Sequence, residues 1–206
     1  GAMLLLYRWH ENGDRRLPLA ATLCMALTGL TTGPLMVLLP PIVMYVYLLV
    51  RGEGGKSAAA KLALCTVIAL VVPALWYIAA FIQGGGRFGE LFMAYHYGSL
   101  KGITTQNLFD HNFIGNLAYA ATGFAPWLIF IVFTLFARPW RSAGIAPTFR
   151  ALAQYMRTAS PLTAFTFTAT LTLLVLSWLP TGNHDISLLC CHVFLSMFTA
   201  LYIAWL

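Results

Sequence analysis

The sequence predicts an all-α, polytopic transmembrane helix bundle, and three observations lead to that fold class. Hydrophobic residues make up 60% of the 206 positions and charged residues only 9%, whereas about 25% of an average soluble domain is charged. Apolar runs recur that approach or exceed the roughly 20 residues needed to cross a bilayer as a helix. Basic residues gather in the short segments between these runs. Topology therefore explains the net charge of +6 better than binding to nucleic acid does.

The apolar runs predict the spans in chain order. They cover residues 17–50, 58–83, 115–136, 161–179 and 188–206. The first run is too long for one span and contains Gly33 and Pro34, where the missing proline N–H motivates a helix break. Two short crossings, 17–30 and 35–50, are the favoured interpretation, and a single tilted, kinked helix is the alternative.

The distribution of lysine and arginine predicts the orientation. Segments 8–16, 51–61 and 137–159 are basic, whereas 84–116 and 180–187 are neutral or acidic. The positive-inside rule places the first group in the cytoplasm and the second outside. That alternation requires an even number of crossings in 17–50, so the sequence predicts about six crossings in a single transmembrane domain over 1–206. A start at Gly1 and a last span that reaches the final residue predict a fragment of a longer chain.

The outer loop 84–116 contains a predicted amphipathic, juxtamembrane helix over 88–101. Phe88 and Phe92 lie on its apolar face, and Glu90 on the polar face. His96 lies at the edge of the apolar face, as a headgroup-level side chain or as a metal ligand. Glu90 is six residues away and cannot form a metal pair with it alone. Tyr95 is an interface anchor or part of a sugar-stacking surface.

Other histidines leave the same two interpretations open. Asp110-His111 and His184-Asp185 lie in outer loops, where a carboxylate can orient an imidazole or simply be solvated. His192 lies inside a predicted span, where an interhelical polar contact is the simpler interpretation and a functional site the other.

The order of several short motifs resembles bacterial membrane glycosyltransferases of the aminoarabinose transferase type, within the protein O-mannosyltransferase superfamily and its GT-C fold. Leu-Thr-Thr-Gly-Pro at 30–34 is similar to the family's Leu-Thr-Lys-Gly-Pro, and Pro-Ala-Leu-Trp-Tyr at 73–77 to its proline–tryptophan–tyrosine helix. Residues 88–102 resemble its juxtamembrane segment, which aligns His96 with a His/Asn position. Residues 179–185 resemble the family's proline and Lys-Arg segment. The resemblance makes this chain the C-terminal part of such a transmembrane region.

The resemblance implies a transferase in the inner membrane of a bacterium, with its active side facing outward. It would pass a sugar from a polyprenyl-phosphate carrier to lipid A or another exported acceptor, and its catalytic acid would lie upstream of Gly1. In some members of the family a histidine of the juxtamembrane segment binds a divalent metal ion. The resemblance implies this role for His96, with Glu90 as a weaker second ligand.

The substrate-binding candidates follow from the matched positions and from the nearby cations. They are Thr32, Gly33, Arg87, Tyr95, Lys101 and His184. The family's basic residues are replaced by Thr32, Ser99 and Asn183-His184, so other cations would have to hold the carrier phosphate. A non-catalytic lipid-binding scaffold or a transporter-like bundle is the alternative function.

Overall fold

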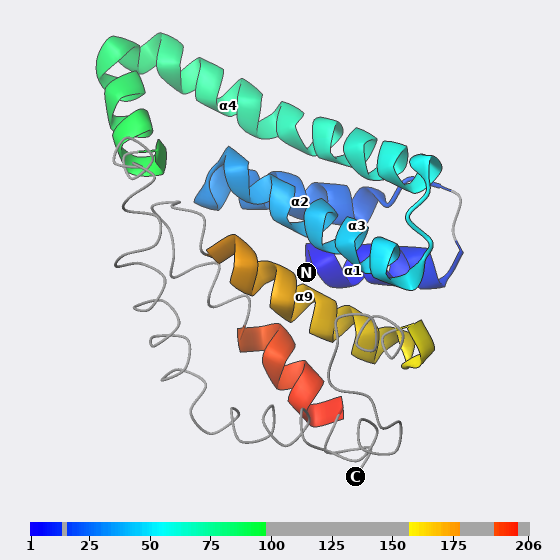
Figure 1. The fold of residues 1–206 in the computed structure, drawn as a ribbon. Coiled ribbons are helices and arrows are strands. Elements are labelled where there is room, and N and C mark those ends of the chain that lie inside the picture. The colour runs from blue at the N-terminus through cyan, green and yellow to red at the C-terminus, as the bar shows by residue number, and fades with distance from the viewer. Residues whose placement is uncertain (14–15, 98–156, 178–191, 202–206) are drawn as a thin grey trace. The chain divides into compact units, whose positions relative to one another are not determined.

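The computed structural model describes residues 1–13, 16–97, 157–177 and 192–201. These residues are helical apart from short turns and contain no strand (Figure 1), which confirms the all-helical class for this part of the chain. The chain forms two compact units, Gly1–Ser99 and Leu100–Leu206. The predicted single domain over 1–206 stays a prediction.

The first unit begins with α1 (Ala2–Glu11), α2 (Leu19–Thr32) and α3 (Leu39–Arg51), with the 3-10 helix η1 (Pro34–Leu38) before α3. Helix α1 packs against both α2 and α3. Gly33 separates α2 from η1 with φ 108° and ψ 159°, a backbone conformation that favours glycine. The predicted helix break at Gly33 and Pro34 is therefore confirmed.

The long helix α4 (Lys56–Tyr97) follows, and it bends at Gly85. Figure 1 shows the helix turning sharply in its green part. The predicted span 58–83 forms the first limb of α4 before the bend. The predicted juxtamembrane helix forms the second limb, at least from Phe88 to Tyr97; residues 98–101 lie outside the described part.

Close packing at Gly29 joins α2 to α4. A methyl group on Gly29 would lie 2.6 Å from both Pro73 Cγ and Val37 Cγ2, so only glycine allows the helices to approach this closely. The Tyr77 hydroxyl donates a hydrogen bond to the Gly29 carbonyl at 3.2 Å. Pro73 lies inside α4, fully buried, and its ring fills the space beside Gly29.

Within the described residues, two helical stretches are long and apolar enough to cross a membrane: η1 together with α3 (Pro34–Arg51), and Lys56–Ala94 of α4. Helix α2 and the two described helices of the second unit are apolar but shorter. The predicted span 115–136 lies outside the described residues. Six crossings therefore stay a prediction.

The second unit contributes α9 (Pro161–Ser177) and the helix His192–Leu201. Ser160 caps α9, since its Oγ accepts the Thr163 N–H at 3.3 Å and Pro161 suits the first helical position. The two helices contact through aromatic pairs, Phe165 with Phe194 at 5.8 Å between ring centroids and Phe167 with Phe198 at 5.5 Å. The threonine at position 166 is fully buried and donates its hydroxyl proton to a carbonyl of its own helix.

Candidate functional site

The predicted site residues fall into three groups in the structure. Thr32 and Gly33 lie at the end of α2, one turn beyond Gly29. Arg87 and Glu90 lie on the second limb of α4, and both are exposed. Tyr95 and His96 belong to the last turn of α4, but their side chains lie outside the described part, as do Lys101, His184 and the Asp110-His111 pair.

The bend of α4 depends on three glycines with different tasks. Gly85 has φ 60° and ψ −152°, a conformation found essentially only at glycine. A methyl group on Gly84 would lie 2.7 Å from Phe88 Cβ, and one on Gly89 would lie 2.8 Å from Phe81 Cε2. Gly85 therefore permits the turn, and Gly84 and Gly89 permit aromatic side chains to close over it.

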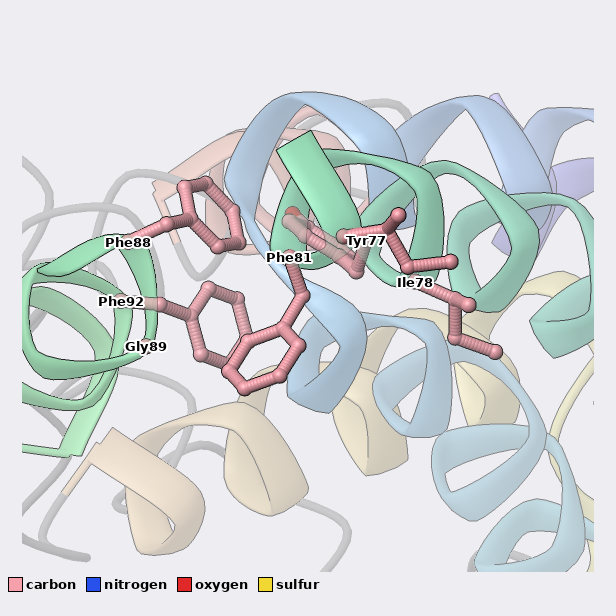
Figure 2. A pocket seen from close by; sticks show the side chains of 7 residues that line it. Tyr77, Ile78, Phe81, Phe88, Gly89 and Phe92 are labelled. Carbon is pink, nitrogen blue, oxygen red and sulfur yellow. The ribbon is translucent and has the colours of Figure 1, made fainter. Parts of the chain in front are cut away.

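An apolar hollow of about 240 Å³ lies in the angle between the two limbs. Its lining comes from both sides of the bend: Tyr77, Ile78, Phe81, Ile82, Phe88, Gly89 and Phe92. Figure 2 shows Phe88 and Phe92 extending from the second limb towards Phe81 and Tyr77 on the first. The rings of Tyr77 and Phe92 are 4.8 Å apart, and those of Phe88 and Phe92 are 6.1 Å apart.

The chemistry of this hollow suits a hydrocarbon chain. Its lining residues are uncharged, and the one hydroxyl among them, on Tyr77, donates to the Gly29 carbonyl of α2. Because its single hydroxyl is already hydrogen-bonded, the hollow has no polar side chain that would orient a sugar or a nucleotide. Burying an apolar ligand in it would contribute roughly 25 cal/mol of binding free energy per Å² of apolar surface removed from water. Arg87 follows the bend by two residues and supplies a nearby positive charge on the same limb.

The hollow was not predicted from sequence, although the sequence contains a signal for it. Aromatic residues stand four apart on each side of the glycine triplet, at Tyr77 and Phe81 before it and at Phe88 and Phe92 after it. Spacing of four places side chains on one face of a helix. A glycine bend between two such faces can turn them towards each other, which is what α4 does.

No group of three or more His, Cys, Asp or Glu side chains that could hold a metal ion lies within the described residues. His96 is outside that search because its side chain is not described. The metal ion at His96 and Glu90 therefore stays a prediction.

Comparisons with known proteins give no relative for this chain: no family model, no curated protein and no solved structure matches it.

Proposed function

We propose that this chain is an integral membrane protein that binds a lipid-linked sugar, as part of a GT-C-type glycosyltransferase. The observation that carries the proposal is the apolar hollow at the bend of α4, placed at the end of a long uncharged helix and followed by Arg87. The proposed function requires insertion in the membrane, an outward-facing bend and recognition of the carrier.

Insertion in the membrane is supported by the charge-free length of α4 and by its exposure. No charged residue or histidine lies between Lys61 and Arg87, a stretch that rises by roughly 37 Å at 1.5 Å per residue and so exceeds a hydrocarbon core of about 30 Å. The core helix of a soluble protein would be mostly buried, whereas only 22% of the apolar window of α4 is buried. Its outward side chains are large and apolar, for example Val67, Leu75 and Ile82. Lipid would cover them.

Orientation follows from the charges at the two ends of the first unit. Arg8, Arg51, Lys56 and Lys61 lie at or near the ends of α1 and α3 and the start of α4. By the positive-inside rule that end faces the cytoplasm, and the bend of α4 faces outward. The resemblance to bacterial transferases would place such a protein in the inner membrane of a bacterium, and an outward active side agrees with this orientation.

Recognition of the carrier combines the hollow and Arg87. A polyprenyl phosphate joins an apolar isoprenoid chain to an anionic head. The hollow would take isoprenoid units, and the Arg87 guanidinium would hold phosphate oxygens through charge-assisted hydrogen bonds. Thr32, Gly33, Tyr95, Lys101 and His184 would complete the head-group and sugar site, and a divalent metal at His96 would assist. Lipid A or another exported molecule would accept the sugar.

Photo-crosslinking tests this function. The protein, reconstituted in nanodiscs, is labelled with a photoactivatable polyprenyl phosphate, and unlabelled polyprenyl phosphate or phosphatidylcholine is added as competitor. We expect Arg87→Gln and Gly89→Leu to reduce labelling several-fold, and Arg87→Lys to retain most of it. Mass spectrometry should place the labelled peptide within α4.

Two results would contradict the proposal. Labelling that Arg87→Gln leaves unchanged, and that phosphatidylcholine competes as well as polyprenyl phosphate, would assign the hollow to a non-catalytic lipid-binding scaffold. Complete extraction of the protein from membranes by alkaline carbonate would exclude insertion altogether.

A further inference from the structure

A second cluster of charged and aromatic side chains lies at the other end of the first unit, away from the bend of α4. The His10 ring and Glu53 approach to 2.7 Å, which joins α1 to the turn between α3 and α4. Lys61 Nζ lies 5.7 Å from the centre of the Trp9 ring, which joins α1 to α4. Trp9 Nε1 also donates to the Arg16 carbonyl at 2.6 Å. These contacts bring residues 9, 10, 16, 53 and 61 together, and Arg8 precedes Trp9 in the last turn of α1.

Cationic side chains outnumber acidic ones there. The basic surface, as we name it, consists of Arg8, Trp9, Arg16, Arg51, Lys56 and Lys61. Among the described residues, two acidic side chains lie near this surface, and both interact with other side chains of the first unit. Glu53 contacts His10 at 2.7 Å and Arg51 at 4.0 Å, and Glu11 accepts a hydrogen bond from the Tyr47 hydroxyl at 3.3 Å. The acids therefore neutralise the surface only in part.

The position of Lys56 has no local structural explanation. It is the first residue of α4 and is exposed, and the first turn of that helix contains no acidic side chain. The positive end of the helix dipole lies there, so a cation is unfavourable to the helix and an external anion is favoured. Lys56 thus adds positive potential where the backbone already supplies it.

We propose that the basic surface binds the headgroups of anionic phospholipids, an inference that rests on the proposed insertion of α4 in the membrane. The ligand must be amphiphilic, because apolar side chains adjoin the cations. Leu19 at the start of α2 and Leu64 in the third turn of α4 are both exposed. Trp9 has the amphipathic ring that favours the headgroup level. An acidic protein or free phosphate would use the cations and leave these leucines without a partner.

Lipid retention measured by native mass spectrometry tests the surface. The purified protein is exchanged into detergent with either phosphatidylglycerol or phosphatidylcholine, and bound lipid is counted as its concentration rises. We expect phosphatidylglycerol to bind more tightly. Arg8→Gln and Lys56→Gln should each weaken it about fivefold, since each cation near a membrane surface contributes about one kilocalorie per mole. Arg8→Lys and Lys56→Arg, which keep the charge, should match the wild type.

Three outcomes would overturn the inference: equal binding of the two lipids, unchanged binding in both glutamine variants, or displacement of phosphatidylglycerol by inorganic phosphate at equal concentration. Because both residues are exposed, circular dichroism of the variants should be unchanged. Polyprenyl-phosphate labelling at the bend should also be unchanged in the same variants. If the wild type binds phosphatidylglycerol but is not labelled by polyprenyl phosphate, the transferase proposal is contradicted. The proposed lipid binding at the basic surface is then still supported.

Discussion

Replacing Gly85 with alanine should straighten α4 and open the hollow. The backbone of Gly85, at φ 60° and ψ −152°, would cost an L-residue about 1–3 kcal/mol. A methyl group added there meets nothing within 4 Å, so this cost comes from the backbone alone. Straightening relieves it but separates the two limbs, and the ring pair of Tyr77 and Phe92 contributes only about 0.5–1.5 kcal/mol beyond its buried area. The free-energy difference between the bent and the straight helix therefore shifts in favour of the straight helix in this variant.

A distance across the bend measures this change. Spin labels at Ser57 and Leu91, both exposed, would be about 51 Å apart along the axis of a straight helix and closer in the bent one. Pulsed electron paramagnetic resonance, with the four native cysteines replaced, should give a short distance in the wild type. Gly85→Ala should add a population near the straight-helix value.

Gly86→Ala is the matched control. A methyl group on Gly86 also meets nothing within 4 Å, and its φ is not positive. Alanine should therefore stabilise the helix there by up to about 1 kcal/mol and leave the distance unchanged. If Gly85→Ala gives the wild-type distance distribution, or if both alanines lengthen it equally, the assignment of the bend to Gly85 is wrong.

Three further substitutions test the packing of the first unit, each by unfolding the purified protein in mixed micelles. Gly29→Ala should destabilise it by about 1–3 kcal/mol through overpacking, and Pro73→Ala in the same background should restore part of the loss; an alanine tolerated alone would refute the close approach. Tyr77→Phe should cost about 0.5–1.5 kcal/mol for the lost hydrogen bond, and no change would mean that water replaces it. Glu53→Gln should cost under about 1 kcal/mol, because its contact with His10 is largely exposed; a larger loss would indicate a stronger pair.

The helix break before Pro34 was predictable from sequence and the bend of α4 was not, for a physical reason. A proline removes a backbone donor wherever it lies, so it acts locally. Three consecutive glycines are compatible with a loop, a helix or a bend, and only contacts between limbs decide among these. From sequence alone, Gly84–Gly86 therefore predicts the start of an outer loop. The structure instead continues the helix through it, with Gly85 alone outside helical geometry.

The candidate site was also only partly predictable from sequence, because its contacts join residues far apart in the chain. The amphipathic pattern of 88–101 correctly predicts a helix in its described part, and it places Phe88 and Phe92 on an apolar face. Helical periodicity says which side chains share a face, but not what that face meets. Phe92 meets Tyr77, fifteen residues earlier. The family-derived candidates, His96 and Lys101 above all, depend on side chains that lie outside the described residues, and they stay predictions.

The two breaks in the first unit also differ in how their backbone groups are satisfied, and this difference bears on membrane insertion. At the end of α2, inside an uncharged run, the Thr32 hydroxyl donates to the Thr28 carbonyl at 2.9 Å, and the Gly33 carbonyl accepts the Met36 N–H at 3.2 Å. Such internal partners are what a break within hydrocarbon requires. At the bend of α4, Arg87 follows Gly85 by two residues, and the surrounding glycines are exposed. Water at a headgroup boundary can hydrate the backbone there. In the proposed membrane protein, the glycine bend would thus lie where it can be tolerated, at the polar end of the apolar helix.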